Sequence, residues 1–166
     1  MSLIDGQKRR KTVKKPKIAV IVGSASDLPK IETGLALLDK FRIKKEVIVA
    51  SAHRTPAKVM EIAKNADKNY DLMIAGAGMA AHLPGVIASY TILPVIGIPI
   101  SSQGLGGFDS LYSIVQMPPG VPVATVAVDG AKNAAILAAQ ILALKYPYLK
   151  KELRAIKDQL KKKGKI

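Results

Sequence analysis

Five short runs of aliphatic residues alternate with segments of helical periodicity, and this alternation constrains the fold more than any other feature. The runs are KIAVIV at 17–22, EVIVA at 46–50, DLMIA at 71–75, LPVIG at 93–97 and VATVAV at 123–128. Strands that alternate with helices form βαβ units, whose parallel sheet is covered on both faces. Right-handed crossovers then predict a doubly wound, three-layer α/β/α fold.

The segments between these runs predict the helices. Leu28, Ile31, Leu35 and Leu38 are spaced by three, four and three residues, which indicates a helix over 28–41 that Asp27 can cap. Further helices are expected from Thr55-Pro56 onward and at about 79–91, 108–116 and 131–144. The last of these is apolar almost all round, so it must be covered on every side. We therefore expect another subunit to contact it.

We divide the chain into an arm, a domain and a final helix. Residues 1–16 have almost no apolar side chains and predict a disordered basic arm. Residues 17–146 form the predicted α/β domain with the candidate site. Residues 147–166 predict an extra basic amphipathic helix, whose apolar seam is Leu149, Leu153, Ile156 and Leu160. Because little of the domain remains for this seam to contact, we expect it to pack on a neighbouring subunit.

The excess positive charge lies at the two ends of the chain. Of the net charge of +14, residues 1–17 contribute +6 and residues 145–166 contribute +7, which leaves +1 for residues 18–144. Nucleic-acid binding by the domain would need a basic stripe on its body, so a nucleic-acid partner is not expected. A non-catalytic nucleotide- or RNA-binding protein stays open as an alternative, which a salt-dependent gel-shift assay would test.

Composition also excludes several classes of site. The chain has no cysteine, which removes thiol nucleophiles, disulfides and cysteine-bound metals, and it has two histidines, so no metal is expected. Its apolar runs are short and broken by Gly and Pro, which argues against a membrane span. The basic N-terminus is followed by no apolar stretch, so it is not a secretory signal, and a cytoplasmic location is expected.

Polar residues gather after four of the predicted strands. The loops are GSASD at 23–27, SAHRTP at 51–56, GAGMAAHLPG at 76–85 and ISSQGLGG at 100–107. In parallel sheets of this kind, ligands bind beyond the carboxyl ends of the strands. The four loops together therefore predict one site, although each of them alone is a weak signal.

Two of these loops suit an anionic ligand. Ser24, Ser26 and Asp27 precede a helix, where free backbone amides and hydroxyls favour an anion, although Ser26 or Asp27 could simply cap the helix. Arg54 offers a planar fork for phosphate or carboxylate. His53 beside it is of the residue type that can gain or lose a proton near neutral pH.

The third loop contains G-x-G-x-x-A, yet we do not interpret it as a dinucleotide site. It follows the third strand, and no acidic residue lies between Asp71 and Asp109 to bind a ribose. Its glycines indicate a close approach of the backbone to a small ligand. His82 lies among Ala and Leu, so it is either a ligand-binding or a buried structural residue.

Four segments carry a resemblance to a known family. GSASD, SAHRTP, AGAGMAAHLPG and DSLYSIVQMPPGVPV occur in the order and spacing typical of the N5-carboxyaminoimidazole ribonucleotide mutases of purine biosynthesis. The chain resembles this family, whose members are also called catalytic subunits of phosphoribosylaminoimidazole carboxylase, over about 17–145. The resemblance implies a homo-octamer of flavodoxin-like subunits that needs no metal or organic cofactor.

The resemblance also implies roles for individual residues. His53 stands where the family has its general acid/base. The implied substrate-binding residues are Ser24, Ser26, Asp27, Ser51, Arg54, Ala77, Gly78, His82 and Leu83. Among them, Asp27 would contact the ribose hydroxyls, and Ser51 and Arg54 the phosphate. Gly78 and His82 fall in the loop that closes over the base and the carboxyl group.

The implied reaction is an isomerisation that moves a carboxyl group from the exocyclic nitrogen of the substrate to ring carbon C4, with CO2 released and recaptured. Related animal-type enzymes, classed as carboxy-lyases, instead carboxylate aminoimidazole ribonucleotide directly, and this stays an alternative. The segment AAHLPG is similar to the mutase class. Two departures are Met79, where many bacterial members have glycine, and the segment 102–108.

Overall fold

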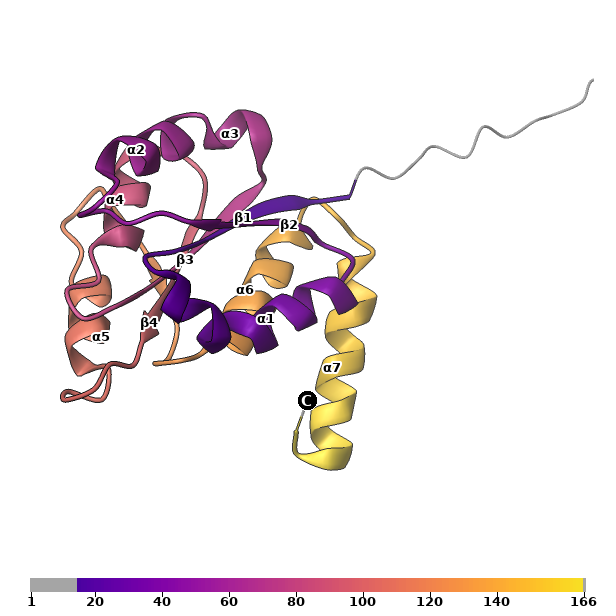
Figure 1. Cartoon of the computed structure of the whole chain (residues 1–166). Coiled ribbons are helices and arrows are strands. Elements are labelled where there is room, and N and C mark those ends of the chain that lie inside the picture. Colours follow the sequence, from indigo (N-terminus) through magenta and orange to yellow (C-terminus); the bar gives the residue numbers. More distant parts are fainter. Residues whose placement is uncertain (1–14, 166) are drawn as a thin grey trace, which may run out of the picture.

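The computed structural model describes residues 15–165 and is built around a parallel five-stranded sheet (Figure 1). The strands are β1 Lys17–Val22, β2 Lys44–Val49, β3 Leu72–Gly78, β4 Val95–Ile100 and β5 Ala124–Thr125. They lie in the order β2-β1-β3-β4-β5, and every neighbouring pair is parallel. This is the strand order of the flavodoxin-like doubly wound fold, so the predicted fold class is confirmed.

Helices cover both faces of this sheet. They are a short 3-10 turn η1 Ala25–Asp27, α1 Leu28–Lys40, α2 Pro56–Lys64, α3 Ala66–Asn69, α4 Leu83–Tyr90, α5 Phe108–Val115, α6 Ala131–Leu142 and α7 Leu149–Lys163. Side chains of α1, α6 and α7 share one hydrophobic core, and those of α2, α4 and α5 share a second core on the opposite face. The three predicted layers are therefore present.

Strand β1 shows how the sequence produces these two cores. Ile18 and Val20 belong to the core on the α1–α6 side, whereas Ala19 and Ile21 belong to the core on the α2–α4 side. All four are at most 1% exposed. Successive residues of a strand point to opposite faces, so an unbroken aliphatic run fits a strand that is covered on both sides.

The outer strands differ from their predicted bounds. β2 begins two residues earlier than predicted and pairs only with β1, so Val47 and Val49 each remain 40% exposed at the edge of the sheet. β5 has two residues instead of the six predicted at 123–128. Pro99 in β4 has no amide hydrogen to donate, and β4 pairs with β5 only through Ile96 and Gly97.

Helices α1 and α6 approach each other closely where Gly34 meets Ala131. A Cβ atom at position 34 would lie 2.5 Å from the Ala131 carbonyl oxygen, so only glycine fits without displacing the backbone. Four alanines of α6 are completely buried: Ala134, Ala135, Ala138 and Ala139. Small side chains on both helices thus allow α6 to lie against α1 and the sheet.

The start of α7 belongs to the core of its own domain. Leu149 is completely buried, and the hydroxyl of Tyr146 donates to Asp71 at 2.9 Å. Leu153 and Ile156 pack, partly buried, against the same core. The expectation that little of the domain remains for this seam to contact is therefore wrong for its first half, because these side chains pack against the core beside α6. Packing of the outer half on a neighbouring subunit stays a prediction.

The predicted basic arm, residues 1–16, lies outside the described residues except for Lys15 and Pro16. Pro16 is buried, and its carbonyl accepts a hydrogen bond from the Lys44 amide at 2.9 Å, which extends the β1–β2 pairing by one residue. The domain thus begins one residue earlier than predicted. Across residues 15–165, no helix has the length and apolarity that crossing a membrane requires.

Candidate active site

The four loops meet at one cleft beyond the carboxyl ends of the strands. Its volume is about 690 Å³. It lies where β1 and β3 are neighbours, the point at which the chain switches from one side of the sheet to the other. All ten residues predicted for the site line this cleft: Ser24, Ser26, Asp27, Ser51, His53, Arg54, Ala77, Gly78, His82 and Leu83.

The loop after β1 is organised by Ser24. Its backbone is extended, and its Oγ accepts hydrogen bonds from the Ser26 amide at 3.4 Å and from the Ser26 hydroxyl at 2.8 Å. Ser24 therefore caps the turn η1, and the predicted cap at Asp27 is wrong. Asp27 has helical backbone angles and makes no capping hydrogen bond, which leaves its carboxylate available to the cleft.

The carboxyl group of Asp27 is partly desolvated. Burial raises its pKa above the usual value, and a backbone hydrogen bond at Ser24 and the positive charge of Arg54 oppose that rise. The guanidinium of Arg54 also donates to the Gly23 carbonyl at 2.6 Å. This contact ties the loop after β2 to the loop after β1.

The loop after β2 is a tight turn around Ser51. Its Oγ accepts from the amides of His53 at 3.3 Å and Arg54 at 3.2 Å, which fixes both side chains at the start of α2. Thr55 immediately precedes α2, but its side chain makes no capping hydrogen bond to this helix. Its hydroxyl instead accepts from the Ser51 amide at 2.9 Å and lies 3.2 Å from the Ser51 carbonyl, to which it donates.

The two histidines of the chain are in direct contact. Nε2 of His53 lies 2.7 Å from Nδ1 of His82, and the two rings meet edge to face at an interplanar angle of 82°. Both side chains are exposed to the cleft, so the alternative of His82 as a buried structural residue is wrong. In this contact one ring nitrogen donates a hydrogen bond and the other accepts it, so the tautomer of one histidine determines which nitrogen of the other carries no hydrogen.

The loop after β3 is shorter than predicted because Gly76–Gly78 continue the strand and pair with Ile98–Ile100 of β4. Ala77 is buried there, and Leu83 begins α4 below the cleft. Met79, which follows the strand, has φ of +55° and a side chain that is 67% exposed. Glycine adopts this left-handed backbone without strain, whereas Met79 as a non-glycine residue adopts it at a cost.

Sequence reasoning missed a polar cluster at the β4 side of the cleft. Lys30 of α1 donates to the Ser101 hydroxyl at 2.8 Å and to the Asp129 carboxylate at 3.3 Å. Asp129 also accepts from the Ser101 amide at 3.0 Å and hydroxyl at 2.6 Å. The only sequence signal for this cluster was the serine pair in ISSQGLGG, which contains Ser101. Lys30 looks like an ordinary residue on the polar face of a helix, and Asp129 follows β5, whose two-residue length gives little signal.

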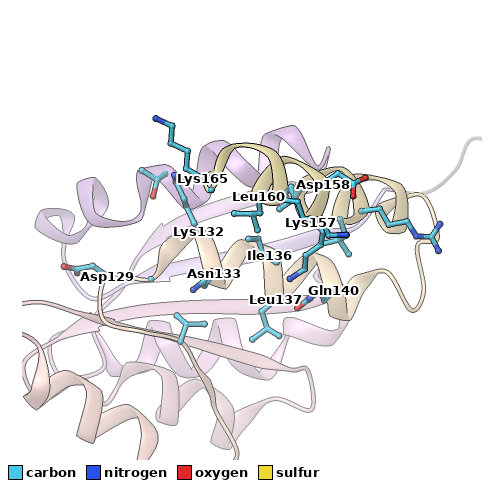
Figure 2. A pocket seen from close by; sticks show the side chains of 18 residues that line it. Asp129, Lys132, Asn133, Ile136, Leu137, Gln140, Lys157, Asp158, Leu160 and Lys165 are labelled. Carbon is cyan, nitrogen blue, oxygen red and sulfur yellow. The ribbon is translucent and has the colours of Figure 1, made fainter.

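Two further features bear on where the active site lies: possible metal-binding clusters and a larger groove elsewhere on the protein. Within residues 15–165, no three His, Cys, Asp or Glu side chains are grouped to hold a metal ion. The largest groove, about 1110 Å³, lies between α6 and α7 (Figure 2). It is lined by apolar side chains such as Ile136, Leu137 and Ile156 and contains neither histidine, so the smaller cleft is the candidate active site.

Comparison with known proteins gives a consistent result. A family profile described as AIR carboxylase matches residues 17–163. The N5-carboxyaminoimidazole ribonucleotide mutase of Pyrococcus horikoshii is 54% identical over 150 residues, which cover 90% of this chain and 85% of that protein. The protein of the same name from Thermotoga maritima is 52% identical over 148 residues, which cover 89% and 86%.

The fold comparison agrees. The solved structure of Treponema denticola PurE matches with a TM-score of 0.72 at 28% identity, covering 90% of this chain and 99% of that one. The family profile extends from the first residue of β1 to the last residue of α7, so it includes every loop of the cleft. The chain therefore belongs to the AIR carboxylase family.

Proposed function

We propose that this protein is an N5-carboxyaminoimidazole ribonucleotide mutase of de novo purine biosynthesis. It converts N5-carboxyaminoimidazole ribonucleotide to 4-carboxy-5-aminoimidazole ribonucleotide. The observation that carries this proposal is the contact of His53 with His82 at 2.7 Å inside a cleft that also contains an arginine, an aspartate and a ring of small residues. Relatives that are more than half identical carry the same name.

The reaction needs little besides proton transfer and confinement. The carboxyl group on the exocyclic nitrogen is a carbamate, so its N–C bond breaks to release CO2. Ring carbon C4 of the electron-rich aminoimidazole then attacks CO2, and a C–C bond forms. His53 donates a proton to the substrate as CO2 leaves and accepts the C4 proton after the attack, so its own protonation state is restored. Proton transfer of this kind contributes about 10²–10⁴-fold to rate.

We assign His82 a positioning role. Because Nδ1 of His82 faces Nε2 of His53, the proton on one ring decides which nitrogen of the other is bare. The contact also orients the His53 ring in an exposed loop. His53 gains and loses a proton during the reaction. Nδ1 of His82 can then switch between donating and accepting the hydrogen bond to His53, while His82 stays at the start of α4.

The substrate is held by the first two loops. We assign the phosphate to Arg54 and Ser51, and the ribose hydroxyls to the carboxylate of Asp27. Ser24 and Ser26 lie beside Asp27 and supply further hydroxyls to the nucleotide. The guanidinium of Arg54 is anchored on the Gly23 carbonyl at 2.6 Å, so it reaches the anion from a fixed position.

CO2 has to be kept next to C4 between the two bond changes. Ala77 and Leu83, which are buried, and Gly78, which is partly buried, line this part of the cleft, whereas the neighbouring Ala80 is exposed. Apolar walls exclude water, and holding CO2 beside the nucleophile supplies the proximity term of catalysis. CO2 is therefore proposed as a bound intermediate on these residues.

Arg54→Lys should weaken nucleotide binding more than it slows the chemical step. Lysine keeps the positive charge but loses the planar fork that binds phosphate through two parallel hydrogen bonds. We expect KM to rise by about tenfold, with a smaller change in kcat. Steady-state kinetics measures both. Equal binding of wild type to the nucleotide and to the free base without ribose phosphate would contradict the assignment.

Two separate assays distinguish the mutase from a direct carboxylase, the alternative suggested by the description of the family profile. In the first, N5-carboxyaminoimidazole ribonucleotide is the only substrate. In the second, aminoimidazole ribonucleotide is supplied with excess CO2. A mutase turns over the first substrate at low CO2, and faster turnover of the second would assign the chain to the carboxylases instead.

We further propose that the protein is a cytoplasmic homo-octamer. The support for assembly is apolar surface that one subunit leaves uncovered. Figure 2 shows the groove between α6 and α7, in which Ile136, Leu137 and Leu160 face the same space. On the opposite core, Phe108 and Tyr112 of α5 stack on each other and are 63% and 61% exposed. Light scattering coupled to size exclusion would give the number of subunits.

A further inference from the structure

The cleft carries two separate positive side chains. Lys30 and Arg54 are the only lysine and arginine of residues 15–165 that line it. Arg54 follows β2, whereas Lys30 is held at the end of β4, and β1 and β3 lie between these two strands. Neighbouring strands are about 4.8 Å apart, so the two strand ends are separated by about 14 Å before the side chains reach inward.

Arg54 and Lys30 each interact with a different partner, so the two positive charges stay at opposite sides of the cleft. Arg54 influences the Asp27 carboxyl, and Lys30 forms its ion pair with Asp129. Burial of the Asp129 carboxyl opposes its ionisation, but hydrogen bonds from Ser101 and from Lys30 outweigh burial and lower its pKa. Asp129 therefore remains negatively charged near neutral pH and holds Lys30 in place.

The Lys30 ammonium retains a donor for a ligand. It has three N–H groups, and the Ser101 hydroxyl and the Asp129 carboxylate accept two of them. The Lys30 side chain is 46% exposed, and it is among the residues that line the cleft. Ser101 follows Ile100, which pairs with Gly78 at the end of β3, so the Lys30–Ser101 pair lies next to the proposed CO2 pocket.

We propose that Lys30 binds the carboxylate of the substrate and of the product, and so selects carboxylated over uncarboxylated nucleotides. The inference rests on the proposed function, in which the ligand has a phosphate at one end and a carboxylate at the other. When Arg54 binds the phosphate of the ligand, the carboxylate at the other end of the ligand faces Lys30. Asp129 acts through Lys30 and Ser101 and is a positioning residue.

This role has a kinetic consequence. Lys30 attracts the carboxylate of the bound substrate and product, whereas the CO2 that forms between them carries no net charge. Removing the lysine therefore weakens binding of both nucleotides without removing a group that acts on CO2. Lys30→Met should raise KM clearly without lowering kcat, because an interaction that is weaker in the transition state than in the bound substrate does not speed the chemical step.

Isothermal titration of a matched pair of ligands tests the proposal. The ligands are 4-carboxy-5-aminoimidazole ribonucleotide and 5-aminoimidazole ribonucleotide, which differ only in the carboxylate. Lys30→Met should bind the carboxylated nucleotide about tenfold more weakly, since a charged hydrogen bond is lost at a partly exposed site, and should bind the other within about twofold of wild type.

Lys40→Met is the control variant, because it removes the same charge from the same helix outside the cleft. It should bind both nucleotides as wild type does, and Lys30→Arg should recover part of the lost selectivity. An equal loss for both nucleotides in Lys30→Met, or no loss for either, would overturn the inference. If wild type binds neither nucleotide, the proposed function itself is wrong, and the inference falls with it.

Discussion

His53→Asn is expected to lower kcat by at least about 10²-fold while nucleotide binding changes far less. Asparagine has a similar polar reach and can still hydrogen-bond to His82, but it does not titrate and cannot carry the proton. The measurement is steady-state turnover of N5-carboxyaminoimidazole ribonucleotide together with a binding titration of the product nucleotide. The binding titration separates a lost acid/base from a distorted cleft.

A companion variant, His82→Asn, provides the control for the histidine contact. It leaves the proton-carrying ring in place and replaces the imidazole that contacts it at 2.7 Å by an amide that does not titrate, so its kcat should lie between those of wild type and His53→Asn. The pH dependence of kcat should also change, because His53 loses a hydrogen-bond partner that can itself gain or lose a proton. A near-wild-type rate for His53→Asn would exclude His53 as the acid/base.

Leu149→Ala should lower the free energy of unfolding by about 2–5 kcal/mol, which is the range for a truncated leucine in a closed core. Leu149 is completely buried among side chains of the α1–α6 core, so truncation loses its apolar contacts and leaves a cavity lined by apolar side chains. Leu160→Ala, farther along the same helix, should cost about 1 kcal/mol or less, because Leu160 is only partly buried. Thermal and chemical unfolding of the two variants measures this difference.

Truncation after Lys145 extends the same test to the whole segment. It removes Leu149 and also the Tyr146 hydroxyl that donates to Asp71, so the melting temperature should fall sharply. The proposed octamer should shift to smaller species if the outer seam contacts a neighbour, which light scattering would show. Equal stability of Leu149→Ala and Leu160→Ala, with an unchanged oligomer after truncation, would mean that α7 is an appendage.

The order of strands and helices could be predicted because the signal is local. A run such as KIAVIV is apolar at every position, and the structure covers it on both faces. The same reasoning correctly placed a strand at EVIVA, but nothing within that segment shows that β2 lies at an edge of the sheet. It also placed a strand at VATVAV but predicted it too long, since the length of β5 depends on how far β4 pairs with it, past Gly97 and toward Pro99.

The site could be predicted where neighbouring residues in the sequence also act together. Ser51, His53 and Arg54 lie in one turn, and the hydrogen bonds of Ser51 hold that turn. Lys30 and Asp129 are 99 residues apart and meet only because α1 and α6 share one face of the sheet. No local pattern identifies such a pair, since a lysine on a helix usually faces solvent.

The contact between Gly34 and Ala131 has a consequence at some distance from it. Lys30 precedes Gly34 by one turn of α1, and Asp129 precedes Ala131 by two residues, so the two pairs lie on the same two segments of chain. Backbone meets backbone at the glycine, with no side chain that could repack to absorb a shift. The distance between Lys30 and Asp129 therefore depends on this close approach of two main chains, and we expect a methyl group added at position 34 to push α1 away from Ala131 and to lengthen the Lys30–Asp129 contact.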